Sequence, residues 1–115
     1  MKEEIQDIIA LPIAGENPSE YAERLGIHYT STVTDEHKRT LGQFFTPLKI
    51  ALFMSSYCKA EKEKIKILDP GCGIGILSIS LIETLITNSP SIKIIELVAF
   101  ETDFRILPYA ESCYH

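Results

Sequence analysis

The sequence has few cysteines, no long apolar run and no excess of positive charge. Its three cysteines, Cys58, Cys72 and Cys113, form no C-x-x-C pair, which argues against a disulfide framework or a zinc site and favours a reducing compartment. No run reaches the ~18 apolar residues that span a bilayer, and the acidic start is untypical of a signal peptide. We therefore expect a cytoplasmic protein that binds no metal and no membrane.

Positive charge is scarce because 11 basic residues stand against 16 acidic ones, which gives a formal net charge of −5. A protein that grips nucleic acid over its whole surface carries a basic excess instead. The lysines of residues 59–66 are interleaved with glutamates, as on a solvated helix end. If DNA is a partner, most of its contacts must therefore lie outside this chain.

What the sequence does contain is enough for one modest domain, since 115 residues fall at the lower end of the roughly 100–200 residues of a typical domain. Short helices are predicted at residues 3–10 and 18–25. Asn17 is the expected N-cap of the second helix and Gly26 its stop, with a proline at its first position.

The stretch after Gly26 is expected to be less regular. Residues 27–33 are β-branched and polar, which favours an extended linker, and Thr34 then caps a short helix. A further helix is predicted from Thr46-Pro47 to about Lys59, with a hydroxyl cap and a proline at its first position. Its apolar residues recur at spacings of 3, 4 and 7, and these four are Ile50, Phe53, Met54 and Tyr57.

The second half alternates strand, helix and strand. Residues 65–69 and 92–101 are apolar, β-branched runs that predict strands, and residues 74–87 predict a helix buried on more than one side. A continuous apolar strand is typical of a parallel sheet covered on both faces. Residues 104–114 predict a last helix that Pro108 interrupts. The fold class is therefore α/β with a partial doubly wound sheet, because a complete one needs about five to seven strands.

The turn after the first predicted strand, LDPGCGIG at residues 68–75, contains Gly71, Gly73 and Gly75. Glycines let a ligand lie against the backbone, and the following helix start offers free amides and a positive dipole end. The dinucleotide pattern G-x-G-x-x-G lacks its third glycine here. The spacing is closer to the loop that holds S-adenosylmethionine in methyltransferases, and a plain turn is the alternative.

Two carboxylates flank this loop. Asp69 can accept a hydrogen bond from the cofactor's amino group, directly or through water, or it simply caps the loop. Glu101 can accept from both ribose hydroxyls, or it is an exposed strand end with Asp103 as its rival for the ribose. Cys72 is expected to be a small neutral filler rather than a nucleophile, because no histidine stands near it in sequence.

Three segments occur in a recognisable order, with GQFFTP at residues 42–47, LDPGCGIG at 68–75 and VAFETD at 98–103. The combination resembles the N6-adenine DNA methyltransferases of restriction-modification systems. In that family a G-x-[FY]-[FY]-T-P element lies upstream of a D-P-x-C-G-x-G loop. The resemblance covers roughly residues 34–104, and GQFFTP is its most specific part.

The resemblance implies a role for each matching residue. Thr46 would bind the carboxylate of the cofactor's methionine part, and Phe44 and Phe45 would pack beside the cofactor. The glycines of the loop would clear space around the methionine and the ribose, and Glu101 would hold the ribose.

The family's catalytic part has no counterpart in the sequence. The Asn-Pro-Pro-[Tyr/Phe] element that holds a flipped adenine, the acidic residue of the third strand and a DNA-recognition domain are all missing. The resemblance thus implies an N-terminal helical segment, residues 1–41, followed by the start of a Rossmann-like, S-adenosylmethionine-binding methyltransferase domain, residues 42–115. We expect an active adenine-specific parent enzyme, and a 115-residue chain that is inactive and binds cofactor weakly or not at all.

Several partners and two alternative functions remain open. DNA would be bound through the missing part of the enzyme, and a cognate restriction endonuclease is a second expected partner. Unpaired sheet edges invite a homo-oligomer. The alternatives are a fragment of a methyltransferase acting on RNA, protein or a small molecule, and a non-catalytic assembly module. The cofactor prediction requires that Thr46 and Glu101 lie close enough to touch one small molecule.

Overall fold

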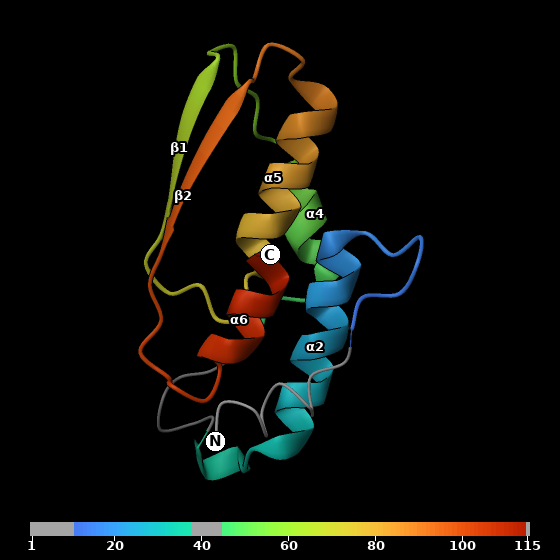
Figure 1. The fold of residues 1–115 in the computed structure, drawn as a ribbon, viewed down its shortest axis with the longest axis vertical. Helices are drawn as coiled ribbons and strands as arrows, with labels where there is room; N and C mark the ends of the chain where they lie inside the picture. The colour runs from blue at the N-terminus through green and yellow to red at the C-terminus, as the bar shows by residue number, and fades with distance from the viewer. Residues whose placement is uncertain (1–10, 38–44, 115) are drawn as a thin grey trace.

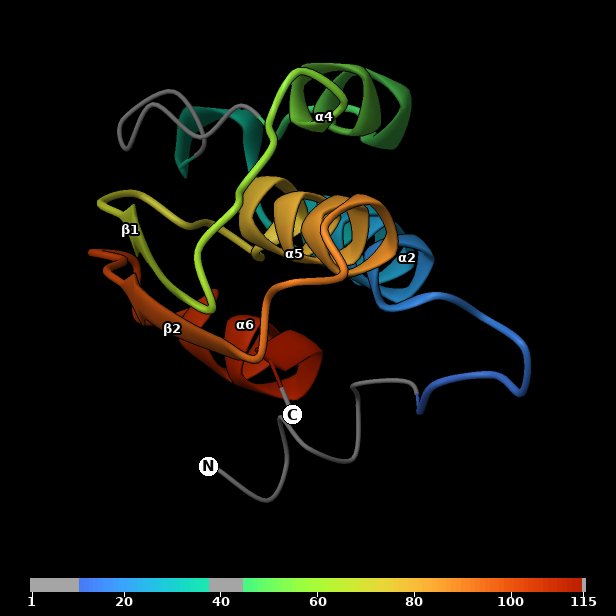
Figure 2. The ribbon, with the colours of Figure 1, turned by 90° about the horizontal axis from the view of Figure 1, so that it is seen from above.

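The computed structural model describes residues 11–37 and 45–114. The helices and strands within these residues follow the order α2 (Pro18–Thr32), α4 (Leu48–Ser55), β1 (Lys64–Asp69), α5 (Ile76–Asn88), β2 (Ile94–Ala99) and α6 (Leu107–Tyr114). Figure 1 shows the sheet along one side of the molecule, with the helices beside it. Seen from above, α5 lies between the sheet and α2, and α4 and α6 lie on opposite sides of α5 (Figure 2).

The sheet consists of β1 and β2, which pair in parallel in a register that runs from Lys64↔Ile94 to Asp69↔Ala99. Because α5 connects them, this part of the chain is one β-α-β unit, as the alternating pattern predicts. The predicted parallel pairing is confirmed. A complete doubly wound sheet is not present in the described residues, so its Rossmann-like completion stays a prediction.

The prediction that the sheet is covered on both faces is wrong. Side chains alternate along both strands between half-buried and exposed, and the exposed ones form what we call the outer face. Its members are Lys64, Lys66, Leu68, Ile94, Glu96 and Val98. The reason is that α5, α4 and α2 lie on the same side of the two strands (Figure 2), so within the described residues the apolar run of β2 has a partner layer on one face only.

Helix α2 begins as predicted and ends later. Asn17 is its N-cap, and the Glu20 side chain accepts from the Asn17 N–H at 3.3 Å. The helix then passes through Gly26 and ends at Thr32, so the predicted stop and the extended linker are wrong. The physical reason is packing, because Gly26 and Tyr29 are both buried in the core, and burial of a large side chain outweighs the ~1 kcal/mol that a helical glycine costs.

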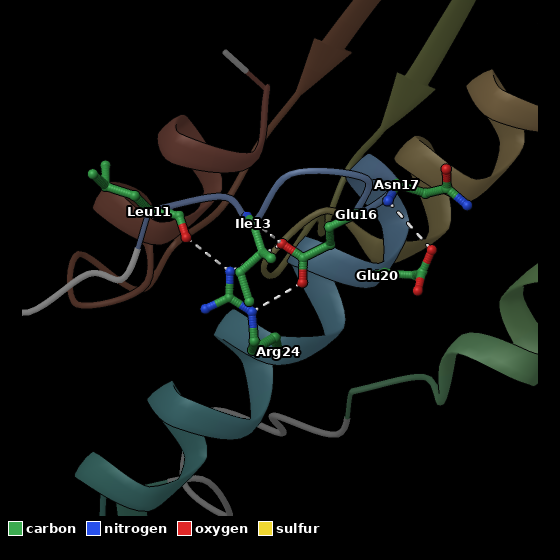
Figure 3. Close-up of polar contacts among 6 residues, drawn as sticks. All are labelled: Leu11, Ile13, Glu16, Asn17, Glu20 and Arg24. Carbon is green, nitrogen blue, oxygen red and sulfur yellow. Dashed lines mark hydrogen bonds and ion pairs between the residues drawn. The ribbon is translucent and has the colours of Figure 1, made fainter.

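An arginine braces the chain that leads into α2 (Figure 3). Arg24 donates from Nε and Nη2 to the two carboxylate oxygens of Glu16, at 2.9 and 3.0 Å, and from Nη2 to the Leu11 carbonyl at 2.9 Å. Such a two-pronged pair is directional as well as attractive. The hydrogen bond from Arg24 is the largest cause that lowers the pKa of Glu16.

After α2, residues 35–37 are helical, and the His37 N–H donates to Thr34 Oγ1 at 3.1 Å, so the predicted Thr34 cap is confirmed. The remainder of that helix and the predicted helix at residues 3–10 lie outside the described residues.

Helix α4 differs from its prediction at both ends. Its N-cap is Pro47 rather than Thr46, it ends at Ser55 rather than near Lys59, and its buried residues are Ala51 and Ser55. The four residues expected to form its buried side, which we call the apolar stripe, are exposed. They are Ile50, Phe53, Met54 and Tyr57. Because α4 lies against α5, two small side chains occupy the contact and the large ones point outward.

The hydrophobic core lies among the helices. Tyr21, Ala22, Leu25 and Tyr29 of α2 form one buried cluster with apolar residues of the glycine loop, α4, α5 and α6. The helix predicted at residues 104–114 is present as α6 but begins at Leu107. The predicted interruption by Pro108 is wrong, because Pro108 is the second residue of α6, where a missing N–H is tolerated. Helix α2, expected to belong to a separate N-terminal segment, therefore shares one core with the residues that follow it.

Candidate cofactor site

The glycine loop lies beside the chain that leaves β2. The Phe100 N–H donates to the Asp69 carbonyl and the Cys72 N–H donates to the Phe100 carbonyl, both at 2.9 Å. These two hydrogen bonds extend the parallel pairing past the ends of the strands. The loop after β1 and the carboxylate after β2 are thereby held next to each other, as expected at the carboxyl ends of parallel strands.

Asp69, the last residue of β1, accepts hydrogen bonds from the loop and from α5. Its Oδ1 accepts from the Gly71 N–H at 3.3 Å, and its Oδ2 accepts from Ser78 Oγ at 2.5 Å. Ser78 is in the first turn of α5, so Asp69 ties the end of β1 to both the loop and the helix. This is the loop-capping role. Its predicted hydrogen bond to a cofactor amino group stays a prediction, and it would use a remaining lone pair of the carboxylate.

Glu101 contacts the loop directly. Its Oε2 accepts from the Gly73 N–H at 3.1 Å, and the residue is half-buried. An ionised carboxylate has about four acceptor positions, so Glu101 keeps capacity for hydroxyl donors. A cavity of about 560 Å³, lined in part by Cys72 and Glu101, adjoins this point between α5, β2 and α6.

Phe45 reaches the same point from the other side. A Cβ built on Gly73 would lie 3.3 Å from Phe45 Cε1, so this ring lies directly against the loop. Phe45 is followed at once by Thr46, which is half-buried. The structure therefore brings Phe45, Gly73 and Glu101 together. That Thr46 and Glu101 reach one small molecule stays a prediction. Phe44 lies outside the described residues.

The start of α4 already holds a carboxylate. The Leu48 N–H donates to Glu23 Oε2 at 3.0 Å, and α4 has no side-chain cap, so the predicted hydroxyl cap by Thr46 is wrong. A helix N-terminus favours an anion, and here the anion comes from α2. Nothing in the sequence pattern indicates this contact. That Thr46 binds the carboxylate of the cofactor stays a prediction. Glu23 would place a second negative charge close to that carboxylate.

The three predicted glycines have different surroundings. Gly73 and Gly75 have φ values of +54° and +99°, which disfavour any side chain. A Cβ on Gly75 would also lie 2.9 Å from the Tyr114 ring. At Gly71 φ is not positive, and a Cβ would meet nothing within 4 Å. Gly71 thus leaves open space over bare backbone, which fits a loop that a ligand approaches closely.

The structure corrects the role of Asp103. The residue is buried, and its Oδ2 accepts from Tyr29 Oη at 2.5 Å and lies 3.0 Å from His37 Nε2. Asp103 is therefore an internal anchor and not a rival for the ribose. His37 is half-buried in the same contact. Sequence reasoning missed Tyr29 because it stands in no motif.

The cysteines carry free thiols. Burial is the main cause that raises the pKa of Cys72, and burial raises the pKa of Cys113 to about 12. A raised pKa keeps a thiol protonated at neutral pH, and the thiolate is the nucleophile. The interpretation of Cys72 as a neutral filler is supported.

Metal ligation and membrane crossing concern the described ranges, residues 11–37 and 45–114. No group of three or more histidine, cysteine, aspartate or glutamate residues there could hold a metal ion. No helix there combines the length and apolarity needed to cross a membrane.

Comparison with known proteins adds a second line of argument. The family described as N-6 DNA Methylase matches residues 28–109. Type II methyltransferase M.AccI of Acinetobacter calcoaceticus is 29% identical over 86 residues, which cover 75% of this chain and 15% of that protein. Type II methyltransferase M.BsuBI of Bacillus subtilis is 39% identical over 75 residues, or 64% of this chain and 15% of that protein. No solved structure gives a significant match.

Proposed function

Because the chain belongs to the N-6 DNA methylase family, we propose that it carries the S-adenosylmethionine-binding part of an adenine-specific DNA methyltransferase. The whole enzyme would transfer a methyl group to the N6 amino nitrogen of adenine. The chain spans about 15% of the length of the curated relatives it matches. Methyl transfer, DNA binding and base selection are therefore proposed for the whole enzyme, and the chain alone is expected to be inactive.

The observation that carries this proposal is the meeting of Phe45, Gly73 and Glu101 at one point. A carboxylate can accept hydrogen bonds from both hydroxyls of a ribose. The open backbone at Gly71 leaves room for the ligand to lie against the loop. The Glu101 carboxylate, the Phe45 ring and a loop without bulky side chains together fit a nucleoside.

Each residue has a proposed task in the bound state. Glu101 holds the ribose, Thr46 donates its hydroxyl to the carboxylate of the methionine part, and Asp69 accepts from the amino group. Phe45 excludes water from one side. When bound, S-adenosylmethionine supplies a methyl carbon made electrophilic by the positive sulfur. No catalytic residue is assigned in this chain, since the groups proposed to hold adenine belong to the rest of the enzyme.

A titration of the isotopically labelled chain with S-adenosylmethionine, followed by NMR, tests the proposal. We expect weak binding, in the millimolar range, with the amide signals of Gly71, Gly73 and Glu101 shifting together. Glu101→Gln should weaken the shifts, and Glu96→Gln, on the exposed outer face of β2, is the control for the same change of charge. Shifts confined to another part of the chain would contradict the proposed site.

The proposed partners follow from the same assignment. DNA would be bound by the remainder of the enzyme, with a cognate restriction endonuclease as a partner in a cytoplasmic setting. An acceptor other than DNA is the alternative.

The outer face favours a second candidate function. Leu68, Ile94 and Val98 are exposed there, as expected of a module that assembles with another copy. Sedimentation velocity tests this, because a concentration-independent monomer would remove the assembly function.

A further inference from the structure

We propose that Tyr29, Asp103 and His37 are positioning residues that set the relative placement of Phe45 and Glu101. The inference rests on the proposed function for the identity of the ligand. The three residues touch no predicted ligand position themselves, and they act through the groups that do. They give the end of α2 and the segment after it a role in the cofactor site.

The first part of the argument is the environment of Asp103. Its side chain is only 5% exposed, and a buried carboxylate needs donors to offset its lost hydration. Tyr29 Oη donates to Oδ2 at 2.5 Å, and the Arg105 N–H donates to Oδ1 at 3.0 Å. His37 Nε2 lies 3.0 Å from Oδ2, and since a carboxylate only accepts, that nitrogen is the donor.

The second part is the route from Tyr29 to Phe45. The two rings meet edge to face, with centroids 5.8 Å apart and planes at 70°. Tyr29 also packs edge-on against Tyr109 at 5.3 Å and is 1% exposed. With its hydroxyl fixed on Asp103 and its ring between two aromatic neighbours, Tyr29 has little freedom to turn. It thereby limits how far the Phe45 ring can move.

The third part is that these contacts form a closed chain, which leads from Asp103 through Tyr29 to Phe45 and back through Glu101. Phe45 lies against Gly73, and the Gly73 N–H donates to Glu101. Glu101 and Asp103 are two residues apart in the segment that follows β2. A shift of Asp103 would therefore displace Glu101 along the chain and Phe45 through Tyr29. The Glu101 carboxylate, proposed to bind the ribose, and the Phe45 ring are therefore both positioned by the buried side chain of Asp103.

Hydrogen exchange at the Gly73 amide tests the proposal without any cofactor. Tyr29→Phe removes the hydroxyl donor to Asp103. Ser19→Ala is the matched control, because Ser19 is also on α2 and its hydroxyl donates to another carboxylate, Glu83, at 2.7 Å. Rates are expressed relative to the Ser89 amide, which donates to the Leu85 carbonyl at the far end of α5. We expect Tyr29→Phe to speed relative exchange at Gly73 about tenfold, and Ser19→Ala to leave it unchanged.

Variants of Asp103 and His37 separate positioning from folding. Asp103→Asn keeps an acceptor for Tyr29, so it should retain much of the protection that Asp103→Ala loses. His37→Gln keeps a donor and should have the smallest effect. Equal acceleration by Tyr29→Phe and Ser19→Ala, or no acceleration by Tyr29→Phe, would overturn the proposal. Since no cofactor is present, a failed titration would refute cofactor binding and leave this result standing.

Discussion

The region around the glycine loop, which we call the loop end, is held by polar contacts, whereas the outer face of the sheet exposes apolar side chains. At the loop end the carboxylates of Asp69, Glu101 and Asp103 all accept hydrogen bonds, and those of Glu101 and Asp103 join residues 28 and 74 positions apart in sequence. On the outer face and along the apolar stripe of α4, large apolar side chains are exposed. The comparison teaches that the described part of the chain is organised around the glycine loop and the helices, and that no residue of the two strands is buried.

The largest expected effect is at the loop end, where Gly75→Ala should lower the free energy of unfolding by about 2–4 kcal/mol. The positive φ contributes roughly 1–2 kcal/mol and the overlap with Tyr114 roughly the rest. Denaturant melts measure it. Gly71→Ala is the control, with a change below about 0.5 kcal/mol, because its Cβ meets nothing. Similar losses in both variants would break the contrast between the two glycines.

The second prediction compares the two sides of α4. Ala51 is fully buried and Phe53 is 62% exposed, although a periodic pattern predicts Phe53 to be inside. Ala51→Leu should cost about 1–3 kcal/mol through overpacking against α5, whereas Phe53→Ala should change stability by no more than about 0.5 kcal/mol. Thermal or urea unfolding of the pair decides it. A greater loss from Phe53→Ala would mean that the apolar stripe is covered in solution.

A smaller effect is expected where the loop end meets α2. Glu23 places a carboxylate on the Leu48 N–H at the start of α4, near the threonine proposed to bind the cofactor's own carboxylate. Glu23→Gln removes a like charge and should tighten S-adenosylmethionine binding about two- to threefold, a gain typical of a charge at a helix end. The NMR titration provides the measurement. Glu20→Gln, one turn earlier on α2 where Glu20 accepts from the Asn17 N–H, controls for net charge. Weaker binding by Glu23→Gln would show that Glu23 is needed to order the helix start.

The smallest predicted effect lies far from the loop, in the ion pair before α2. Hydrogen bonding to Arg24 lowers the pKa of Glu16 below its usual value of 4.5. A lowered folded-state pKa adds stability above the unfolded pKa, and this is lost as the pH falls through the folded value. The wild-type chain should therefore exceed Glu16→Gln in stability at neutral pH, and the difference should shrink as the pH falls below 4.5 and vanish below the lowered folded-state pKa. A difference that persists in acid would indicate a contribution other than charge.

Sequence reasoning found most of the candidate site but not what holds it. Phe45, Gly73 and Glu101 were all predicted, because each stands in a motif whose chemistry is readable locally. Their meeting in the structure is consistent with that prediction, although cofactor binding itself stays proposed. Tyr29 and Asp103 could not be assigned, because their partnership joins positions 74 residues apart.

The sequence by itself determined the local structure of the chain, that is, which segments form strands, helices and the glycine loop. The apolar runs, the Asn17 cap and the glycines with positive φ specify two parallel strands, a helix between them and a bare loop, because these depend on backbone sterics and short-range hydrogen bonds. Only the tertiary structure decided which faces are buried. Because of packing, α2 continues through Gly26, the small side chains of α4 face the core, and the outer face of the sheet is exposed. Burial depends on which partners are near in space and not on the periodicity of one segment.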